Sequence, residues 1–140
     1  MTYEESSVLI TGASQGIGRS ISIAFAAALD RPLILLARNE TNLLETKKLC
    51  LDAGAKDVAI LTCDATDEKE TGALQIPEGF PKPGIMINNA GSFLYKKVTE
   101  TSNIEFHQQI DINLFTAVNV TKRFLPEMKE LDRSLIINIC

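Results

Sequence analysis

Three glycines near the start of the chain have the spacing of a phosphate-binding turn. Gly12, Gly16 and Gly18 follow the apolar run Val8–Ile10 and precede a helix-like stretch over 19–29. One glycine lets the chain turn sharply off a strand, another lets the backbone approach a pyrophosphate, and a third lets the helix pack closely on the sheet. The free N–H groups and the dipole of the helix's first turn then attract the anion. This order of strand, turn and helix predicts a nucleotide-binding unit.

The elements that must position this turn follow from five short apolar runs separated by helix-like segments. The runs are rich in Ile, Leu and Val and show little polar alternation, which is typical of strands buried on both faces of a parallel sheet. Strands that alternate with helices predict an α/β fold with a doubly wound parallel sheet. We expect these strands near 8–11, 33–37, 58–62, 85–88 and 135–140.

Local signals place the helices. Asn39 is expected to cap a helix that Gly54 ends, and Ser102 with Glu105 indicates a capping box that opens a long helix reaching about Lys129. Between 67 and 84, three prolines leave room for at most two helical turns, around 68–75, followed by an irregular loop. The long helix carries an apolar stripe that includes Ile110, Leu114, Val118 and Leu125.

Composition narrows the class of protein. The 140 residues contain 14 basic and 18 acidic side chains, a net charge of −4. This balance gives no basic footprint for nucleic acid and no polybasic patch for a membrane. The first residues lack the cationic and apolar regions of a secretory signal, and no apolar run reaches membrane-spanning length. We therefore expect a cytoplasmic protein that acts on small molecules, without nucleic-acid or membrane partners.

Cysteine and histidine give no sign of a metal site. Cys50, Cys63 and Cys140 are far apart and form no C-x-x-C pair, and His107 is the one histidine. We expect no metal and no disulfide framework, with Cys50 and Cys63 as small buried hydrophobic residues. We expect His107 to have a surface or capping role rather than a catalytic one.

Several motif-like blocks follow one another along the chain: Thr11-Gly-x-x-x-Gly-x-Gly18, Asp64, Asn88-Asn89-Ala90-Gly91, Asn113 and Ile136-Ile137-Asn138-Ile139. In order and spacing, these blocks together resemble the short-chain dehydrogenase/reductase family. The resemblance covers the chain from about Ser7 onward and implies a Rossmann-like, three-layer fold. It also implies a nicotinamide dinucleotide cofactor and hydride transfer between nicotinamide and a carbonyl or alcohol substrate.

The resemblance assigns cofactor contacts residue by residue. It places the Asp64 side chain and the Ala65 backbone at the adenine, and the Asn-Asn-Ala-Gly block along the adenosine and nicotinamide side. The alternative for that block is a simple strand-ending turn, because Asn and Gly are common in turns. The implied cofactor-binding residues are Gly12, Ser14, Gly16, Ile17, Gly18, Arg38, Asp64, Ala65, Asn89, Ala90 and Gly91.

The end of the second strand bears on the choice between NAD and NADP. An acidic side chain there would accept hydrogen bonds from a ribose 2′-hydroxyl and repel a 2′-phosphate, but Ala37 occupies the place where the family carries it. Arg38 instead offers a cation to a 2′-phosphate, with Ser14 as a second contact. NADP is favoured over NAD. Two points oppose it: Gln15 stands where some NADP-using relatives carry a basic residue, and Arg38 would also suit a solvated helix start.

Of the family's catalytic groups, the sequence matches only one. Family members use tyrosine as general acid/base, a lysine that lowers its pKa, a serine that holds the substrate oxygen and an asparagine that anchors a water relay. Asn113 matches the asparagine, at a position suited to a helix kink, although one local hydrogen bond on a helix face is an equal alternative. No Tyr-x-x-x-Lys exists, since Tyr3 and Tyr95 are followed four residues later by serine and threonine. Cys140 matches the residue before the catalytic serine.

Three hypotheses follow for residues 1–140. The first is a single NAD(P)-binding domain, incomplete at its C-terminus after the fifth strand, which belongs to an NADP-dependent oxidoreductase and is inactive alone. The second is a non-catalytic short isoform that binds nucleotide or pairs with other subunits through the helix near 102–129, including as a homo-oligomer. The third is an unstable remnant, because 135–139 would be an apolar edge strand prone to aggregation.

Overall fold

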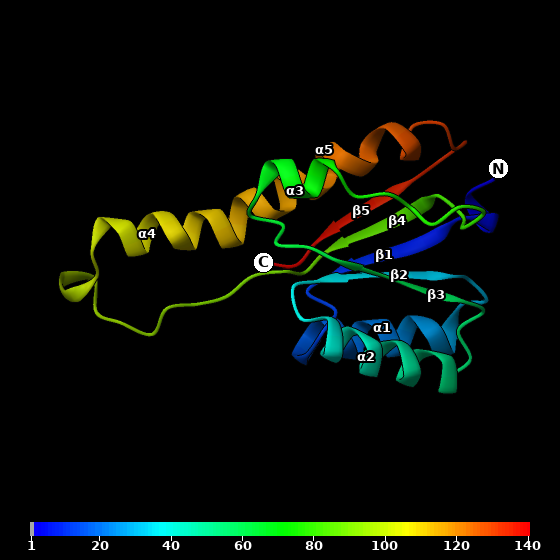
Figure 1. Ribbon diagram of the computed structural model, residues 1–140, viewed down its shortest axis with the longest axis horizontal. Coiled ribbons are helices and arrows are strands. Elements are labelled where there is room, and N and C mark those ends of the chain that lie inside the picture. Colours follow the sequence, from blue (N-terminus) through cyan, green and yellow to red (C-terminus); the bar gives the residue numbers. More distant parts are fainter. Residues whose placement is uncertain (1) are drawn as a thin grey trace.

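The computed structural model describes residues 2–140 and has a five-stranded parallel sheet at its centre (Figure 1). The strand order is β3-β2-β1-β4-β5, so the chain winds outward from β1 to β3 and then crosses to β4 on the other side. This order confirms the doubly wound, Rossmann-like α/β fold. The strands are β1 (Ser7–Thr11), β2 (Leu33–Ala37), β3 (Val58–Thr62), β4 (Pro83–Asn88) and β5 (Leu135–Asn138).

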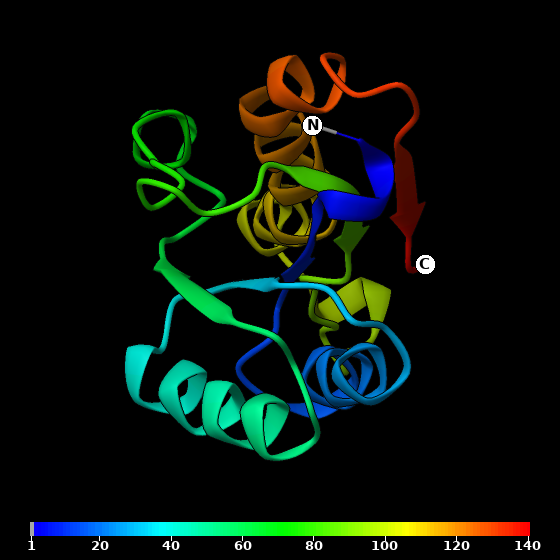
Figure 2. The same ribbon diagram turned by 90° about the vertical axis from the view of Figure 1, so that its right-hand side faces the viewer.

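Helices cover both faces of the sheet, giving three layers (Figure 2). α1 (Gly16–Ala28) and α2 (Glu40–Asp52) lie on one face, and α3 (Glu68–Gly72) and α5 (Thr116–Met128) lie on the other. Successive strand residues point to opposite faces, so Val8 joins the core under α1 and α2 while Leu9 joins the core under α5. Both faces are therefore apolar, which explains why the strands lack polar alternation.

The expected local signals are confirmed, with small shifts at element ends. The Asn39 side chain accepts a hydrogen bond from the Asn42 N–H and caps α2, and Ser102 and Glu105 form the capping box of α4 (Asn103–Ile110). The helix expected around 68–75 is shorter, since α3 ends at Gly72. β5 likewise ends at Asn138 rather than at Cys140.

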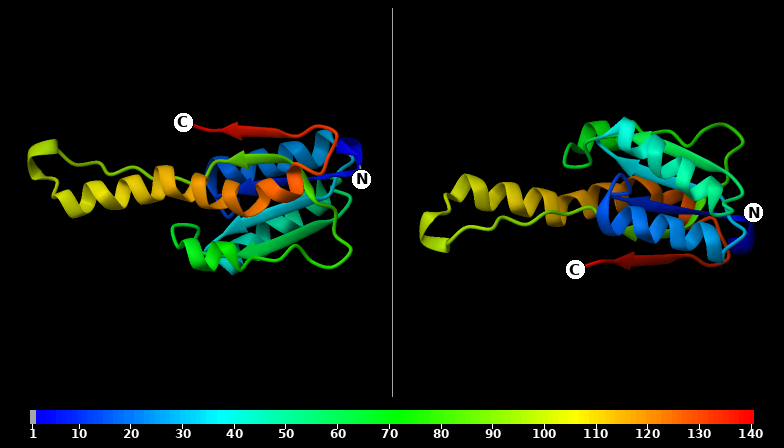
Figure 3. Two further views of the ribbon diagram at one scale, coloured as in Figure 1. Left: turned by 90° about the horizontal axis from the view of Figure 1, so that it is seen from above. Right: turned by 90° about the horizontal axis from the view of Figure 1, so that it is seen from below.

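The long helix expected over 102–129 is interrupted. A single π-helical turn, Asp111–Phe115, separates α4 from α5, and α4 projects beyond the sheet (Figure 3). The face of α5 that packs on the sheet contains Thr116, Asn119, Val120, Phe124 and Met128. The apolar stripe seen in the sequence is largely a different face, because Ile110, Leu114 and Val118 are 47, 54 and 38% exposed.

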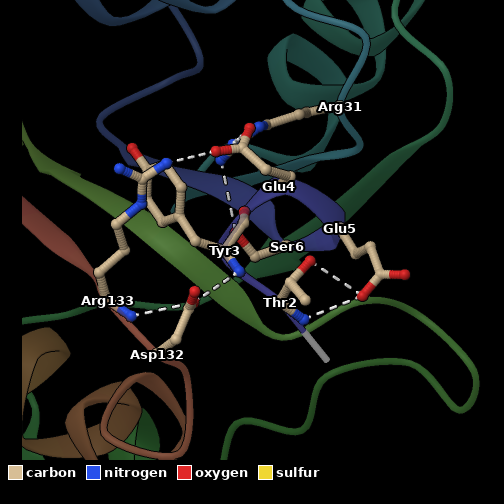
Figure 4. A network of polar contacts seen from close by, with 8 residues as sticks. All are labelled: Thr2, Tyr3, Glu4, Glu5, Ser6, Arg31, Asp132 and Arg133. Atoms are coloured by element: carbon tan, nitrogen blue, oxygen red, sulfur yellow. Dashed lines mark hydrogen bonds and ion pairs between the residues drawn. The ribbon is translucent and has the colours of Figure 1, made fainter.

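The start of the chain is fixed at the end of the sheet where β1 begins (Figure 4). The ring of Tyr3 lies between the guanidinium groups of Arg31 and Arg133, 4.3 and 4.5 Å from its centroid. Glu4 pairs with both arginines, and the two guanidinium groups, Arg133 first, lower the pKa of Glu4. The Tyr3 N–H donates to Asp132. These contacts tie the N-terminal segment to the turn before β2 and to the connection before β5.

Candidate functional site

A cleft of about 520 Å³ opens beside the carboxyl ends of β1 to β4. In a doubly wound sheet, this edge is the ligand-binding crevice, at the point where the strand order reverses. Gly18 and Asn113 lie outside its lining, behind the glycine turn and beside Gly91 respectively. The other predicted site residues line it together: Gly12, Ser14, Gly16, Ile17, Arg38, Asp64, Ala65, Asn89, Ala90 and Gly91.

The glycine turn has the backbone that its sequence predicts. Gly12 turns the chain off β1 with a φ of +66°, a conformation that L side chains rarely adopt. A Cβ on Gly18 would lie 2.0 Å from the Gly12 carbonyl oxygen, so a side chain there would force the turn and α1 apart. Among residues 2–140, no side chain caps the first turn of α1, whose N-cap is Gln15. Its N–H groups are therefore available to an anion.

The Thr11 hydroxyl joins the glycine turn to the Asn-Asn-Ala-Gly block, a role that the sequence analysis missed. Thr11 Oγ1 accepts the backbone N–H groups of Asn89 and Ala90 at 3.0 and 2.9 Å. The Asn89 amide in turn donates to the Thr11 carbonyl oxygen at 3.2 Å. These bonds fix the ends of β1 and β4 relative to each other. The signal available in the sequence was a hydroxyl residue ending an otherwise aliphatic strand.

The ends of β2 and β3 present opposite charges to the cleft. Arg38 is exposed at the mouth, directly after Ala37. Asp64 Oδ1 accepts hydrogen bonds from the Thr66 hydroxyl at 2.8 Å and the Thr66 N–H at 3.1 Å. The Thr66 hydroxyl, then the Thr66 N–H and the positive charge of Arg38 lower the pKa of Asp64, although partial burial opposes them. Asp64 is therefore ionised at neutral pH and retains a second oxygen that can accept a hydrogen bond.

Asn119 supports the loop after β3 from behind and was not selected from the sequence. Its buried side chain projects from α5, and Nδ2 donates to the carbonyl oxygens of Ala65 and Thr66 at 3.0 and 3.3 Å. The backbone that lines this wall of the cleft is thereby fixed to a helix. Its position one turn after Thr116 on the buried face of α5 was the available signal.

Asn113 lies in the π-helical turn, where the sequence predicted a kink. Nδ2 donates to the carbonyl oxygens of Ser92 and Gln109 at 2.8 and 2.9 Å, and Oδ1 accepts the Ser92 N–H at 3.1 Å. A Cβ on Gly91 would lie 2.7 Å from this Oδ1, so glycine is needed beside it. Asn113 therefore fixes the chain segment that leaves the cleft, with more than the one local bond of the alternative interpretation.

Neither tyrosine lines the cleft. Tyr3 is held in the N-terminal network at the other end of the sheet, and Tyr95 is 97% exposed on the loop before α4. Cys63 is buried in the wall of the cleft, where burial raises the pKa of its thiol. Within residues 2–140, no cluster of three or more His, Cys, Asp or Glu side chains could hold a metal ion. In the same range, no helix has both the length and the apolar character needed to cross a bilayer.

Comparison with known proteins identifies the family. The sequence model described as short chain dehydrogenase matches residues 6–140. The chain belongs to the short-chain dehydrogenase family. Among related short-chain dehydrogenases, mouse (Mus musculus) Dehydrogenase/reductase SDR family member 7 is 33% identical in an alignment of 137 residues that covers 94% of this chain and 40% of the mouse protein.

Solved structures of short-chain dehydrogenases have the same fold. An alcohol dehydrogenase from Thermococcus sibiricus complexed with 5-hydroxy-NADP is 29% identical with a TM-score of 0.81, over 90% of this chain and 54% of that one. A 3-oxoacyl-[acyl-carrier protein] reductase from Brucella melitensis with bound NAD is 29% identical with a TM-score of 0.85, over 96% and 52%. The chain thus spans about half the length of these structures.

Proposed function

We propose that residues 1–140 bind NADP(H), as the cofactor-binding part of a short-chain oxidoreductase. The observation that carries the proposal is the uncapped first turn of α1 beside a cleft that Arg38 also lines, with no acidic side chain at position 37. An uncapped helix start favours a pyrophosphate, and a guanidinium favours a 2′-phosphate. The relatives complexed with 5-hydroxy-NADP or NAD support a nicotinamide dinucleotide of one kind or the other.

We assign the lining residues to the parts of such a dinucleotide. We propose that Gly12, Gly16 and Ile17 receive the pyrophosphate, because open space lies beside Gly16 where a side chain would otherwise project. The free oxygen of Asp64 and the backbone of Ala65 would hold the adenine. Asn89, Ala90 and Gly91 would line the adenosine and nicotinamide side. When bound, the nicotinamide supplies or accepts the hydride.

The preference for NADP over NAD rests on the end of β2. With alanine at position 37, no carboxylate stands there to accept the 2′-hydroxyl of NAD, while Arg38 and the nearby Ser14 hydroxyl can meet a 2′-phosphate. Arg38→Asp should therefore weaken NADPH binding by about 10–100-fold, since charge-assisted contacts contribute about 1.5–3 kcal/mol, and should strengthen NADH binding. Isothermal titration measures both dissociation constants. Unchanged affinity for both cofactors would contradict the assignment.

Hydride transfer also needs a group that gives or takes a proton. In the family this group is the tyrosine of Tyr-x-x-x-Lys, and these 140 residues contain no such pattern. We propose that Asn113 contributes to catalysis indirectly, by fixing the segment after Gly91. The chain alone should then oxidise no NADPH with any carbonyl substrate. The complete oxidoreductase would act on a carbonyl or alcohol. Measurable turnover by residues 1–140 would contradict this placement of the catalytic groups.

A non-catalytic, subunit-pairing role is the second candidate. It is favoured by the exposed apolar side chains of Ile110, Leu114 and Val118 along one face of α4 and α5. Such a face is suited to another helix of the same kind, which would give a homo-oligomer or a pair with a longer relative. Native mass spectrometry of the chain, alone and mixed with such a relative, distinguishes pairing from a monomer.

A further inference from the structure

Arg19 links the glycine turn to α2 from behind the cleft. It lies in the first turn of α1, and its guanidinium points toward α2. Nη2 donates to the Ser14 carbonyl oxygen at 2.8 Å, to the Asn42 carbonyl oxygen at 3.3 Å and to Glu45 Oε2 at 2.9 Å. Nε donates to the Thr46 hydroxyl at 2.9 Å. One side chain thus contacts one residue of the glycine turn and three residues of α2.

The two carbonyl groups belong to residues of different elements that both line the cleft. Ser14 lies in the glycine turn and Asn42 in the first turn of α2, while Arg19 itself is not part of the lining. Arg38 lies on the cleft at the end of β2, just before α2 begins. The guanidinium therefore ties Ser14 to the start of α2, the helix that follows Arg38.

Its contacts differ in how far water can replace them. The Arg19 side chain is 23% exposed and its ion-pair partner Glu45 is 60% exposed, so the ion pair is well screened. Thr46, whose hydroxyl accepts the hydrogen bond from Arg19 Nε, is fully buried. The same hydroxyl donates to the Asn42 carbonyl oxygen at 3.1 Å. The bonds to Ser14, Asn42 and Thr46, rather than the ion pair, are therefore the ones that fix the geometry.

We infer that Arg19 is a positioning residue for cofactor selectivity, which holds Ser14 at the distance from Arg38 that a 2′-phosphate requires. This inference rests on the proposed binding of NADP(H). A 2′-phosphate that Ser14 and Arg38 contact together has an affinity that depends on the separation of these two residues. A 2′-hydroxyl is smaller and uncharged. Loosening the link between the glycine turn and α2 should therefore weaken NADPH binding more than NADH binding.

The test compares dissociation constants of NADPH and NADH, measured by nicotinamide fluorescence, across matched variants of the chain. Arg19→Met removes every bond of the guanidinium and should weaken NADPH binding about tenfold, but NADH binding less than about threefold. Arg19→Lys keeps the charge but offers a single donor nitrogen, so its effect on NADPH binding should lie between that of the wild type and that of Arg19→Met. Glu45→Gln removes the ion pair alone and should change either constant less than about twofold.

The outcomes separate the two claims. Equal weakening of both cofactors in Arg19→Met, or no weakening of either, would show that Arg19 is merely structural and would overturn the inference. A wild-type chain that binds neither cofactor, or prefers NADH, would instead contradict the proposed function. If Arg19→Met does not fold, Thr46→Val removes the acceptor of Nε together with the bond from Thr46 to the Asn42 carbonyl oxygen, and both Thr46→Val and Arg19→Lys should shift the ratio of the NADPH and NADH dissociation constants in the same direction.

Discussion

Replacing Thr11 with valine removes one buried hydroxyl that holds the lining residues Asn89 and Ala90, with almost no change in shape. The hydroxyl accepts the N–H groups of Asn89 and Ala90 at 3.0 and 2.9 Å, and valine leaves both without that acceptor. An unsatisfied buried donor costs about 1–3 kcal/mol, and because these two are half-buried we expect a total loss of about 2–3 kcal/mol. At about 3 °C per kcal/mol for a domain of this size, the melting temperature should fall by about 6–9 °C.

Thr11→Ser is the matched control, because it keeps the hydroxyl and loses one methyl group, at a cost of about 1 kcal/mol. Urea unfolding followed by circular dichroism measures both free energies of unfolding. Valine favours strands at least as well as threonine, so a loss of stability cannot be ascribed to strand propensity. If Thr11→Val is as stable as Thr11→Ser, the hydroxyl does not hold the two strand ends together, and this part of the account is refuted.

Three further predictions concern other parts of the molecule. Gly18→Ala should destabilise the fold and abolish nucleotide binding, because its Cβ would lie 2.0 Å from the Gly12 carbonyl oxygen; thermal melts and titration check this. Asn119→Ala should weaken NADPH binding by about fivefold, since it frees the loop after β3, and hydrogen exchange there should rise. Lys96, followed by bonds from Ser102, lowers the pKa of Glu105 to about 2. The contribution of Glu105 to the free energy of unfolding is therefore complete above the unfolded pKa of 4.5 and is lost as the pH falls toward about 2. Acid titration followed by NMR should show the lowered pKa, and Glu105→Gln should flatten this pH dependence of stability.

Much of the fold was predictable because its signals are local. The strands of a parallel sheet are covered on both faces, so each appears in the sequence as an unbroken apolar run. The capping residues Asn39 and Ser102 and the glycine turn likewise act within a few residues of their own positions. The polar atoms of Asn113 on an apolar helix suggested an irregularity there, and Asn113 lies in the π-helical turn.

The groups that hold the cleft together were not predictable in this way. Thr11, Arg19 and Asn119 act on backbone atoms or side chains of other elements, and sequence periodicity contains no information on which backbone groups will meet them. The exposure of Leu114 and Val118 was also hidden, because an apolar stripe does not by itself show which face of a helix packs on the sheet. The predicted binding residues other than Gly18 and Asn113 do line one cleft, and their contacts with a dinucleotide stay a prediction.

The most direct test of the account is isothermal titration of residues 1–140 with NADPH and with NADH under the same conditions. We expect saturable binding at one site per chain, with a lower dissociation constant for NADPH than for NADH. Binding of neither dinucleotide by a chain that melts cooperatively would contradict the proposed role of the glycine turn and the first turn of α1. Tighter binding of NADH would contradict the role assigned to Arg38.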